Sequence, residues 1–416
     1  HWAAGDRLVF LADLDGWPHL YSVPATGGDP TLLTPGRFMV EYVTLTPDRT
    51  TLVYNANTGN HPDDSERRHL FRVGVDGGAP TALTSGDGIQ WAPAVTADGG
   101  TLAYIASDAR RPPLVHVRAL DGGTPRALGA ELVGSDFPSS QLVTPELVVV
   151  KAPDGTPVHC QLFRSPNGPA RRPAVVFVHG GPARQMLLGW DYLWYYAYAY
   201  GVHQYMASRG FIVLAVNYRL GIGYGHDFHH PRHTGPRGAS EYQDVLAAGK
   251  YLQARSDVDP ARIGIWGGSY GGYLTALALG RNSDVFAAGV DLHGRHDFTN
   301  FPSTRQQLAA VVGDGISSEQ LAEAMRVAWQ SSPTSWVKSW KSPVLFIHGD
   351  DDRNVPVEQT VDLVQRLRKT GVPFEELIIP DEIHSFLTYR SWLRVNEAVV
   401  GFFNRKLGHR GSSDPQ

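Results

Sequence analysis

Two patterns of hydrophobic and polar residues divide the chain. Up to about residue 130, short β-rich runs are separated by turns that contain glycine and aspartate. From about residue 145, continuous apolar runs alternate with longer stretches of helical character. Continuous apolar runs are typical of strands buried on both faces of a parallel sheet. The pattern therefore predicts a β part followed by an α/β part.

The β part repeats itself. Each copy has a β-rich run, a turn, a second run that ends in an aromatic or apolar residue, and a Gly-Gly turn. The Gly-Gly pairs begin at Gly27, Gly77 and Gly122. A period of about 45–50 residues with several short strands is typical of β-propeller blades. A β-sandwich with coincidental turns is the alternative.

We predict that residues 1–140 are the C-terminal blades of a β-propeller. Propellers close with roughly four to eight blades, and about three copies are visible here. The chain also begins with His1 and not with methionine. We therefore expect that the start of the propeller is missing.

The second part predicts an α/β-hydrolase fold with a mostly parallel, doubly wound sheet. A hairpin is expected over 147–162. The continuous apolar runs that follow it lie at 174–178, 211–216, 263–266, 344–347 and 377–379. The stretches expected to be helical lie at 240–254, 357–369 and 392–407. Strands that alternate with helices form parallel sheets. We place this domain at 141–410 and expect a disordered tail at 411–416.

Composition narrows the function classes. The 416 residues carry a formal net charge of −4, and 42% are hydrophobic. This is an ordinary globular composition, and the charge argues against nucleic acid as a partner. The sequence contains no run of about 18 uncharged apolar residues, so no membrane span is predicted. Cys160 is the single cysteine, so an intrachain disulfide is excluded. No leader is visible, and the pattern leaves open a cytoplasmic or a periplasmic or secreted location.

A nucleophile motif follows the apolar run at 263–266. Residues 267–271 read Gly-Gly-Ser-Tyr-Gly, and a helix-like stretch follows them. Gly-x-Ser-x-Gly between a strand and a helix is the nucleophile elbow of α/β-hydrolases. The turn is too sharp for side chains beside the serine, and it lifts the hydroxyl where a base can reach it. We predict Ser269 as the nucleophile.

An acid and a base are expected after the serine, in that order. The apolar run at 344–347 leads to three consecutive aspartates, Asp350, Asp351 and Asp352. The next run leads to His384, the only histidine in its loop. In such a triad the histidine moves the proton, while the aspartate orients the ring and stabilises its charge. The position alone leaves the three aspartates as alternatives.

An oxyanion hole needs two N–H donors. One is expected on Tyr270, directly after the nucleophile, and the other in the loop after an early strand. That loop reads His-Gly-Gly-Pro at 179–182, and we predict the Gly181 N–H as the second donor. A simple tight turn is the alternative for this loop.

These motifs together resemble the prolyl oligopeptidase family of serine peptidases, which includes dipeptidyl and acylaminoacyl peptidases. The resemblance rests on the order of the triad, His-Gly-Gly-Pro, Asn-Tyr-Arg at 217–219, Gly-Gly-Ser-Tyr-Gly-Gly at 267–272, and His-Gly-x-x-Asp-x-Asn-Val at 348–355. It covers about 145–408 strongly, and the blade repeats match the family's propeller. The family pattern selects Asp352 from the three aspartates.

The resemblance also implies substrate-binding positions. Asn354 matches a position that binds the substrate backbone, and Tyr270 and Val355 match a pocket for the residue before the scissile bond. His179 stands where dipeptidyl peptidase IV has a tyrosine that helps to hold the oxyanion. The loop at 293–298 lacks the aromatic cluster of a proline pocket. Strict cleavage after proline is therefore not implied.

We predict a serine peptidase that hydrolyses short peptides, of dipeptidyl, acylaminoacyl or oligopeptidase type. An esterase or broad acyl hydrolase on the same triad is the main alternative, because esters and amides share the acyl-enzyme route. A non-catalytic binding protein is a third. We predict a peptide as the partner, consider a homodimer, and expect no cofactor. We also predict no metal site, since His226, His229, His230 and His233 follow no zinc spacing and have no cysteine beside them.

Overall fold

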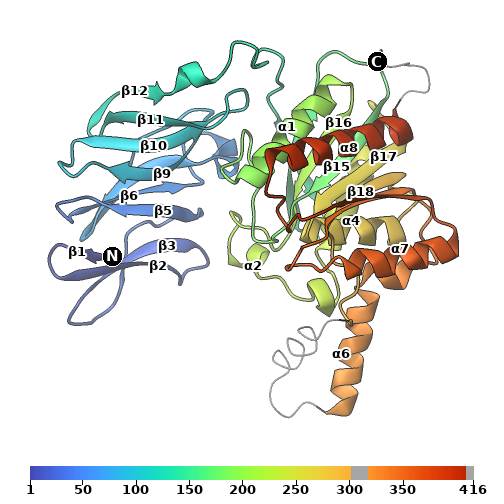
Figure 1. Ribbon diagram of the computed structural model, residues 1–416. Coiled ribbons are helices and arrows are strands. Elements are labelled where there is room, and N and C mark those ends of the chain that lie inside the picture. Colours follow the sequence, from blue (N-terminus) through green and yellow to red (C-terminus); the bar gives the residue numbers. More distant parts are fainter. Residues whose placement is uncertain (301–316, 409–416) are drawn as a thin grey trace. The chain divides into compact units, whose positions relative to one another are not determined.

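The computed structural model describes residues 1–300 and 317–408 (Figure 1). The chain forms two compact units. The first comprises His1–Leu147, Gln185–Tyr200 and Gly221–His230, and the second comprises the rest of the chain. Two segments that come later in the chain than Leu147 therefore pack with the first unit. The predicted disordered tail at 411–416 lies outside the described residues.

The first unit contains three antiparallel sheets of four strands each. Their strands are β1 (Trp2–Ala3), β2 (Arg7–Asp13), β3 (Pro18–Pro24), β4 (Thr31–Leu32), β5 (Val40–Leu45), β6 (Thr51–Ala56), β7 (His69–Gly74), β8 (Gly77–Ala82), β9 (Ile89–Val95), β10 (Thr101–Ser107), β11 (Leu114–Ala119) and β12 (Gly122–Leu128). Each sheet corresponds to one copy of the repeat. Gly77 and Gly122 have φ values of 122° and 147°, which explains the glycines at these turns. The predicted propeller-like blades are confirmed.

The second unit is built on a sheet of eight strands in the order β13-β14-β16-β15-β17-β18-β19-β20. The strands are β13 (Glu146–Lys151), β14 (Pro157–Arg164), β15 (Arg172–Val178), β16 (Ile212–Asn217), β17 (Val258–Gly268), β18 (Ala288–Leu292), β19 (Val344–Gly349) and β20 (Phe374–Ile379). Strand β14 pairs with β16 in antiparallel fashion, and every pair from β16 to β20 is parallel. All seven residues of β15 are buried, as its continuous apolar run predicts.

Helices cover both faces of this sheet. The helices that contact the sheet include α3 (Tyr242–Ala254), α4 (Tyr270–Arg281) and α8 (Tyr389–Leu407). The chain also forms α1 (Trp194–Ser208), α6 (Ser318–Gln330) and α7 (Glu358–Thr370), with short helical turns at α2 (His226–His229) in the first unit and elsewhere. A Cβ atom on Gly264 would meet Phe403 of α8, whereas a Cβ atom on Gly289 would meet Leu279 of α4. The predicted doubly wound arrangement is confirmed.

The helix expected from residue 392 begins earlier, at Tyr389. The side chain of Thr388 accepts the N–H of Ser391 and caps the first turn. In the part of the chain that the structure describes, no helix has the length and apolar character needed to cross a bilayer.

Candidate active site

Ser269 lies at the junction of β17 and α4, as the motif predicts. Its φ of 59° and ψ of −116° put the backbone in a region that side-chain-bearing residues rarely adopt. A Cβ atom at Gly267 or at Gly271 would overlap the carbonyl oxygen of Val178 in β15. The two glycines are therefore needed because a neighbouring strand touches the turn, in addition to the strain at the serine.

The backbone N–H of Ser269 donates to two acceptors. The carbonyl oxygen of Leu292 in β18 lies 2.9 Å from the nitrogen. Nδ1 of the next residue, His293, lies 3.0 Å from the same nitrogen. The elbow is thus held by the adjacent strand and by the first side chain beyond that strand.

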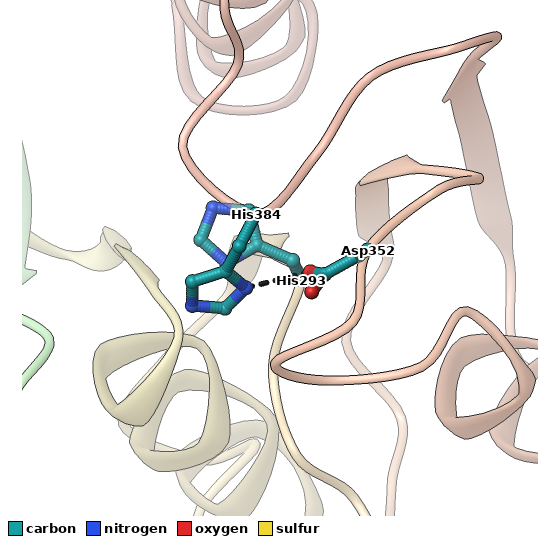
Figure 2. Close-up of side chains that lie close together, drawn as sticks. All are labelled: His293, Asp352 and His384. Carbon is teal, nitrogen blue, oxygen red and sulfur yellow. Dashed lines mark hydrogen bonds and ion pairs between the residues drawn. The ribbon is translucent and has the colours of Figure 1, made fainter.

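Asp352 and His384 form a hydrogen-bonded pair (Figure 2). Nδ1 of His384 lies 2.6 Å from Oδ2 of Asp352, whose side chain has no exposed surface. Oδ1 of Asp352 accepts the backbone N–H groups of Asn354 and Val355 at 2.8 and 2.9 Å. Oδ2 faces Nδ1 of His384 and also lies 3.3 Å from Nε2 of His348.

The electrostatics keep Asp352 ionised. Burial raises the pKa of this carboxyl group, but hydrogen bonds from His348, His384 and the backbone of Val355 outweigh burial, so the pKa lies well below its usual range. Because the carboxylate accepts from Nδ1 of His384, the lone pair of the neutral ring is on Nε2. That nitrogen is the one that can take up a proton.

The other two aspartates do not join this pair. Asp350 and Asp351 are exposed. Oδ1 of Asp350 accepts the backbone N–H of Asp381 at 2.7 Å, which is a loop contact. The geometry therefore favours the aspartate that the family pattern selects.

His293 connects the serine to this pair. Its ring centroid lies 4.3 Å from that of His384, and the rings are tilted by 50°. Figure 2 shows the two rings beside the carboxylate of Asp352. From the sequence, His293 is distinguished only as part of the loop at 293–298. Its position at the carboxyl end of the strand next to the elbow is the feature that would have marked it.

The two predicted oxyanion donors follow neighbouring parallel strands of the sheet. Tyr270 is the first residue of α4, so its N–H has no acceptor within the helix. Gly181 follows β15 with a φ of 112°, where a side chain would be strained. Both positions lie beyond carboxyl ends of neighbouring strands, β17 and β15.

The side chain of Tyr270 is held by a buried acid. Its hydroxyl donates to Oε1 of Glu241 at 2.7 Å, and Glu241 has no exposed surface. The carboxylate also accepts the N–H of Gly235. Burial raises the pKa of Glu241 although these hydrogen bonds oppose it. Sequence analysis did not identify Glu241, because nothing in its local sequence indicates a partner 29 residues away.

The predicted substrate-binding residues differ in their surroundings. His179 is fully buried, its ring stacks on Tyr218 at 4.3 Å, and its Nδ1 lies 2.9 Å from the Gly180 oxygen. Burial lowers the pKa of His179 to about 4, so the ring is neutral at pH 7. Asn354 is exposed and Val355 is half-buried. Contact of these three residues with a substrate stays a prediction.

One group of described residues could hold a metal ion. The ligand atoms of His293, Asp352 and His384 lie within 4.8 Å of one another. Two imidazoles and a carboxylate are a set that zinc accepts. However, Nδ1 of each histidine is already hydrogen bonded, one to Ser269 N–H and the other to Asp352. These hydrogen bonds account for one nitrogen of each ring without a metal ion.

Comparison with known proteins gives a consistent family. Residues 197–410 match the prolyl oligopeptidase family, and residues 2–113 match the dipeptidyl peptidase IV N-terminal region. Dipeptidyl aminopeptidase BIII of Pseudoxanthomonas mexicana is 29% identical over 246 residues, which are 57% of this chain and 34% of that protein. The acylamino-acid-releasing enzyme of Arabidopsis thaliana is 27% identical over 54% of this chain and 29% of its own length. The chain spans about a third of the length of these curated relatives.

Solved structures agree on the fold. A puromycin-hydrolyzing peptidase of Mycobacterium tuberculosis superimposes with a TM-score of 0.81 and 25% identity, over 98% of this chain and 62% of the other. A puromycin hydrolase superimposes with a TM-score of 0.83 and 23% identity, over 100% of this chain and 62% of the other.

Proposed function

The chain belongs to the prolyl oligopeptidase family, and from this membership we propose that it is a serine peptidase that cleaves short peptides. The observation that carries the proposal is the hydrogen bond between His384 and the buried carboxylate of Asp352. The side chain of His293 connects this pair to the elbow of Ser269. Hydrolysis of amides by serine requires a base whose tautomer is fixed, and this pair supplies it.

In the proposed reaction, the hydroxyl of Ser269 attacks the carbonyl carbon of the scissile bond. Nε2 of His384 takes up the hydroxyl proton and later gives it to the leaving amine. Asp352 stays ionised and stabilises the imidazolium. Water then attacks the acyl-enzyme with the same histidine as base, and this step releases the acid product.

The oxyanion that forms in each step needs two donors. We propose the N–H groups of Gly181 and Tyr270 for this role. The positive end of α4 is directed at the same site and favours the developing negative charge. The Tyr270–Glu241 hydrogen bond restrains the residue that supplies one of these donors.

The peptide class is supported by the relatives. Those reported above are named a dipeptidyl aminopeptidase, an acylamino-acid-releasing enzyme and puromycin-hydrolysing enzymes. We propose Asn354, Val355 and His179 as substrate-site positions, directly or through their loops. An esterase or broad acyl hydrolase remains the second candidate, because the same triad cleaves esters.

Two assignments about organisation are also proposals. Residues 1–140 would form the blades and 141–410 the peptidase domain. A homodimer would give twice the monomer mass in light scattering, and a single monomer peak at all concentrations would reject it.

The test is a comparison of rates on four chromogenic substrates. These are two free-amine dipeptide anilides ending in proline and in alanine, an N-acetylated amino-acid anilide, and a short-chain nitrophenyl ester. Ser269→Ala is the blank. Turnover of an anilide by the wild type but not by Ser269→Ala would support the peptidase. Preference for a free or an acetylated amino group in the substrate would then distinguish a dipeptidyl peptidase from an acylaminoacyl peptidase. Turnover of the ester alone would replace the peptidase with the esterase.

A further inference from the structure

One residue outside the triad contacts the segments that carry all three proposed catalytic residues. Nδ1 of His293 faces the backbone N–H of Ser269 at 3.0 Å. Its ring packs against that of His384. Its backbone N–H donates to Ile347 at 2.8 Å, in the strand that leads to Asp352. His293 therefore lies where the three segments meet.

The hydrogen bond to the elbow determines the tautomer of His293. A nitrogen that accepts a hydrogen bond carries a lone pair, so the proton of the neutral ring is on Nε2. A second proton would have to go to Nδ1, and it would replace one of the two acceptors of the Ser269 N–H with a donor. Only the neutral ring can therefore hold the elbow in this way.

The surroundings keep the ring neutral. His293 is 1% exposed, and the titratable groups around it are His384, His348 and Asp352. Burial is the main cause of its lowered pKa, and the two histidines add to it while the aspartate opposes it. The pKa of His293 thus lies well below its ordinary value. A neutral neighbour matters because His384 must become positively charged during the reaction.

The loop that carries His293 is anchored by other residues. The backbone N–H groups of His296 and Asp297 both donate to Oε1 of Gln359 at 2.8 Å. The ring of His296 bridges from the Gln359 carbonyl, 3.0 Å from Nδ1, to Asp291, 2.7 Å from Nε2. Replacing His293 therefore leaves these anchors in place.

We propose that His293 is a positioning residue for the nucleophile and the base. As a neutral acceptor it restrains the strained backbone of Ser269, and its ring supports one side of His384. This inference rests on the proposed function, because it assigns a role within that reaction. It concerns how the reacting groups are held and not which groups react.

Three substitutions at His293 distinguish the effect of its hydrogen-bond acceptor from the effect of its ring. His293→Asn keeps an acceptor, since its Oδ1 can occupy the place of Nδ1, and asparagine tolerates the positive φ of 40°. His293→Leu has nearly the shape of asparagine but no acceptor. His293→Phe keeps a ring and has no acceptor. A displacement of about 1 Å in a catalytic group can cost about 100-fold in rate.

We expect kcat to fall about 10- to 100-fold in His293→Leu and His293→Phe. The KM should change less than threefold, because the residue positions the reacting groups and is not proposed to bind the substrate. A threefold change corresponds to about 0.6 kcal/mol. His293→Asn should retain kcat within about threefold of the wild type. The rate of labelling of Ser269 by a fluorophosphonate should follow the same order, since it reports the nucleophile without a peptide.

His203→Phe is the matched control, since it replaces a buried histidine by phenylalanine in the same unit. The ring of His203 packs against those of Phe163 and Phe177, with centroids 5.2 and 4.6 Å away. Thermal unfolding of each variant shows whether it is folded. If His293→Phe fails to fold, His293→Leu replaces it in the comparison.

Equal kcat and equal labelling rates in wild type, His293→Leu and His293→Phe would overturn the inference. So would an equal loss in the asparagine and leucine variants, because the acceptor would then be irrelevant. Failure of the proposed function looks different: the wild type itself would neither react with the fluorophosphonate nor cleave any anilide or ester.

Discussion

The replacement of Asp352 by asparagine tests the centre of the proposed site. In the wild type, Oδ1 accepts two backbone N–H groups, from Asn354 and Val355, and Oδ2 accepts Nδ1–H of His384. An asparagine keeps the two backbone bonds only if its oxygen takes the place of Oδ1. Its NH₂ group then faces Nδ1 of the histidine.

The consequence is a change of tautomer at His384. A donor opposite Nδ1 requires the lone pair on that nitrogen, so the proton moves to Nε2. The ring can then no longer accept the proton of Ser269. The opposite amide orientation would place NH₂ against two N–H donors, and it would lose two hydrogen bonds of about 1 kcal/mol each. The inactive tautomer is therefore favoured.

The expected loss in kcat/KM is about 10³- to 10⁴-fold, as for an aspartate that fixes the tautomer in a serine triad. This corresponds to about 4–5.5 kcal/mol of transition-state stabilisation. Steady-state rates on the best anilide substrate at pH 8 measure it. The unfolding midpoint should stay near that of the wild type, because the backbone hydrogen bonds remain.

Asp350→Asn and Asp351→Asn are the matched controls. Both residues are exposed neighbours of Asp352 and would lose the same charge. They should retain kcat/KM within about twofold, since exposed charges contribute little. A loss below tenfold in Asp352→Asn would refute the assignment. An equal loss in either control would transfer the role to that aspartate.

Two further predictions concern the supports of the site, and a third concerns an ion pair with a buried aspartate in the second unit. Gly271→Ala should reduce soluble, active protein at least tenfold, because the added Cβ atom would overlap the Val178 oxygen, and expression with fluorophosphonate labelling measures this. Tyr270→Phe should lower kcat about 3- to 10-fold with unchanged circular dichroism, because Glu241 loses a donor at 2.7 Å and the oxyanion donor loses its restraint. Arg219→Met should lower the free energy of unfolding by about 3–5 kcal/mol, because it leaves the buried Asp244 unpaired. Burial raises the pKa of Asp244 and Arg219 lowers it, so in the variant the pKa rises further. The loss of unfolding free energy should therefore be largest above the pKa of Asp244 in the variant. It should shrink as the pH falls and the carboxyl group is protonated. Urea unfolding at pH 5 and pH 8 measures the difference, and an equal deficit at both values would refute this explanation.

Much of the architecture could be predicted from local patterns. The elbow is recognisable because its sharp turn requires glycine on both sides of the serine, which gives the motif Gly-x-Ser-x-Gly. The strand β17 and the helix α4 flank Ser269 as this motif predicts. The continuous apolar run of β15 reflects burial on both faces. The repeat of the Gly-Gly turns is confirmed as three four-stranded sheets. Each element of these patterns is a short run of consecutive residues, so each can be recognised from the sequence alone.

The packing of segments could not be read in the same way. Gln185–Tyr200 and Gly221–His230 follow the first strands of the α/β part, yet they pack with the first unit. The hydroxyl of Tyr192 in the first of these segments donates to Glu41 at 3.0 Å, and that of Tyr224 in the second donates to Glu66 at 2.7 Å. These partners are more than 150 positions apart in the chain. No local pattern predicts contacts of that separation.

The sequence by itself predicts Ser269 as the nucleophile and His384 as the base, because each is the single residue of its kind in a loop after a strand. It left three aspartates as alternatives, and only a family resemblance selected Asp352. The tertiary structure separates them physically, since Asp352 alone of the three is buried against His384. His293 and Glu241 emerged only from the structure. Their roles depend on the order of strands and on side-chain burial, which bring distant residues within hydrogen-bonding distance, and a linear pattern does not contain that proximity.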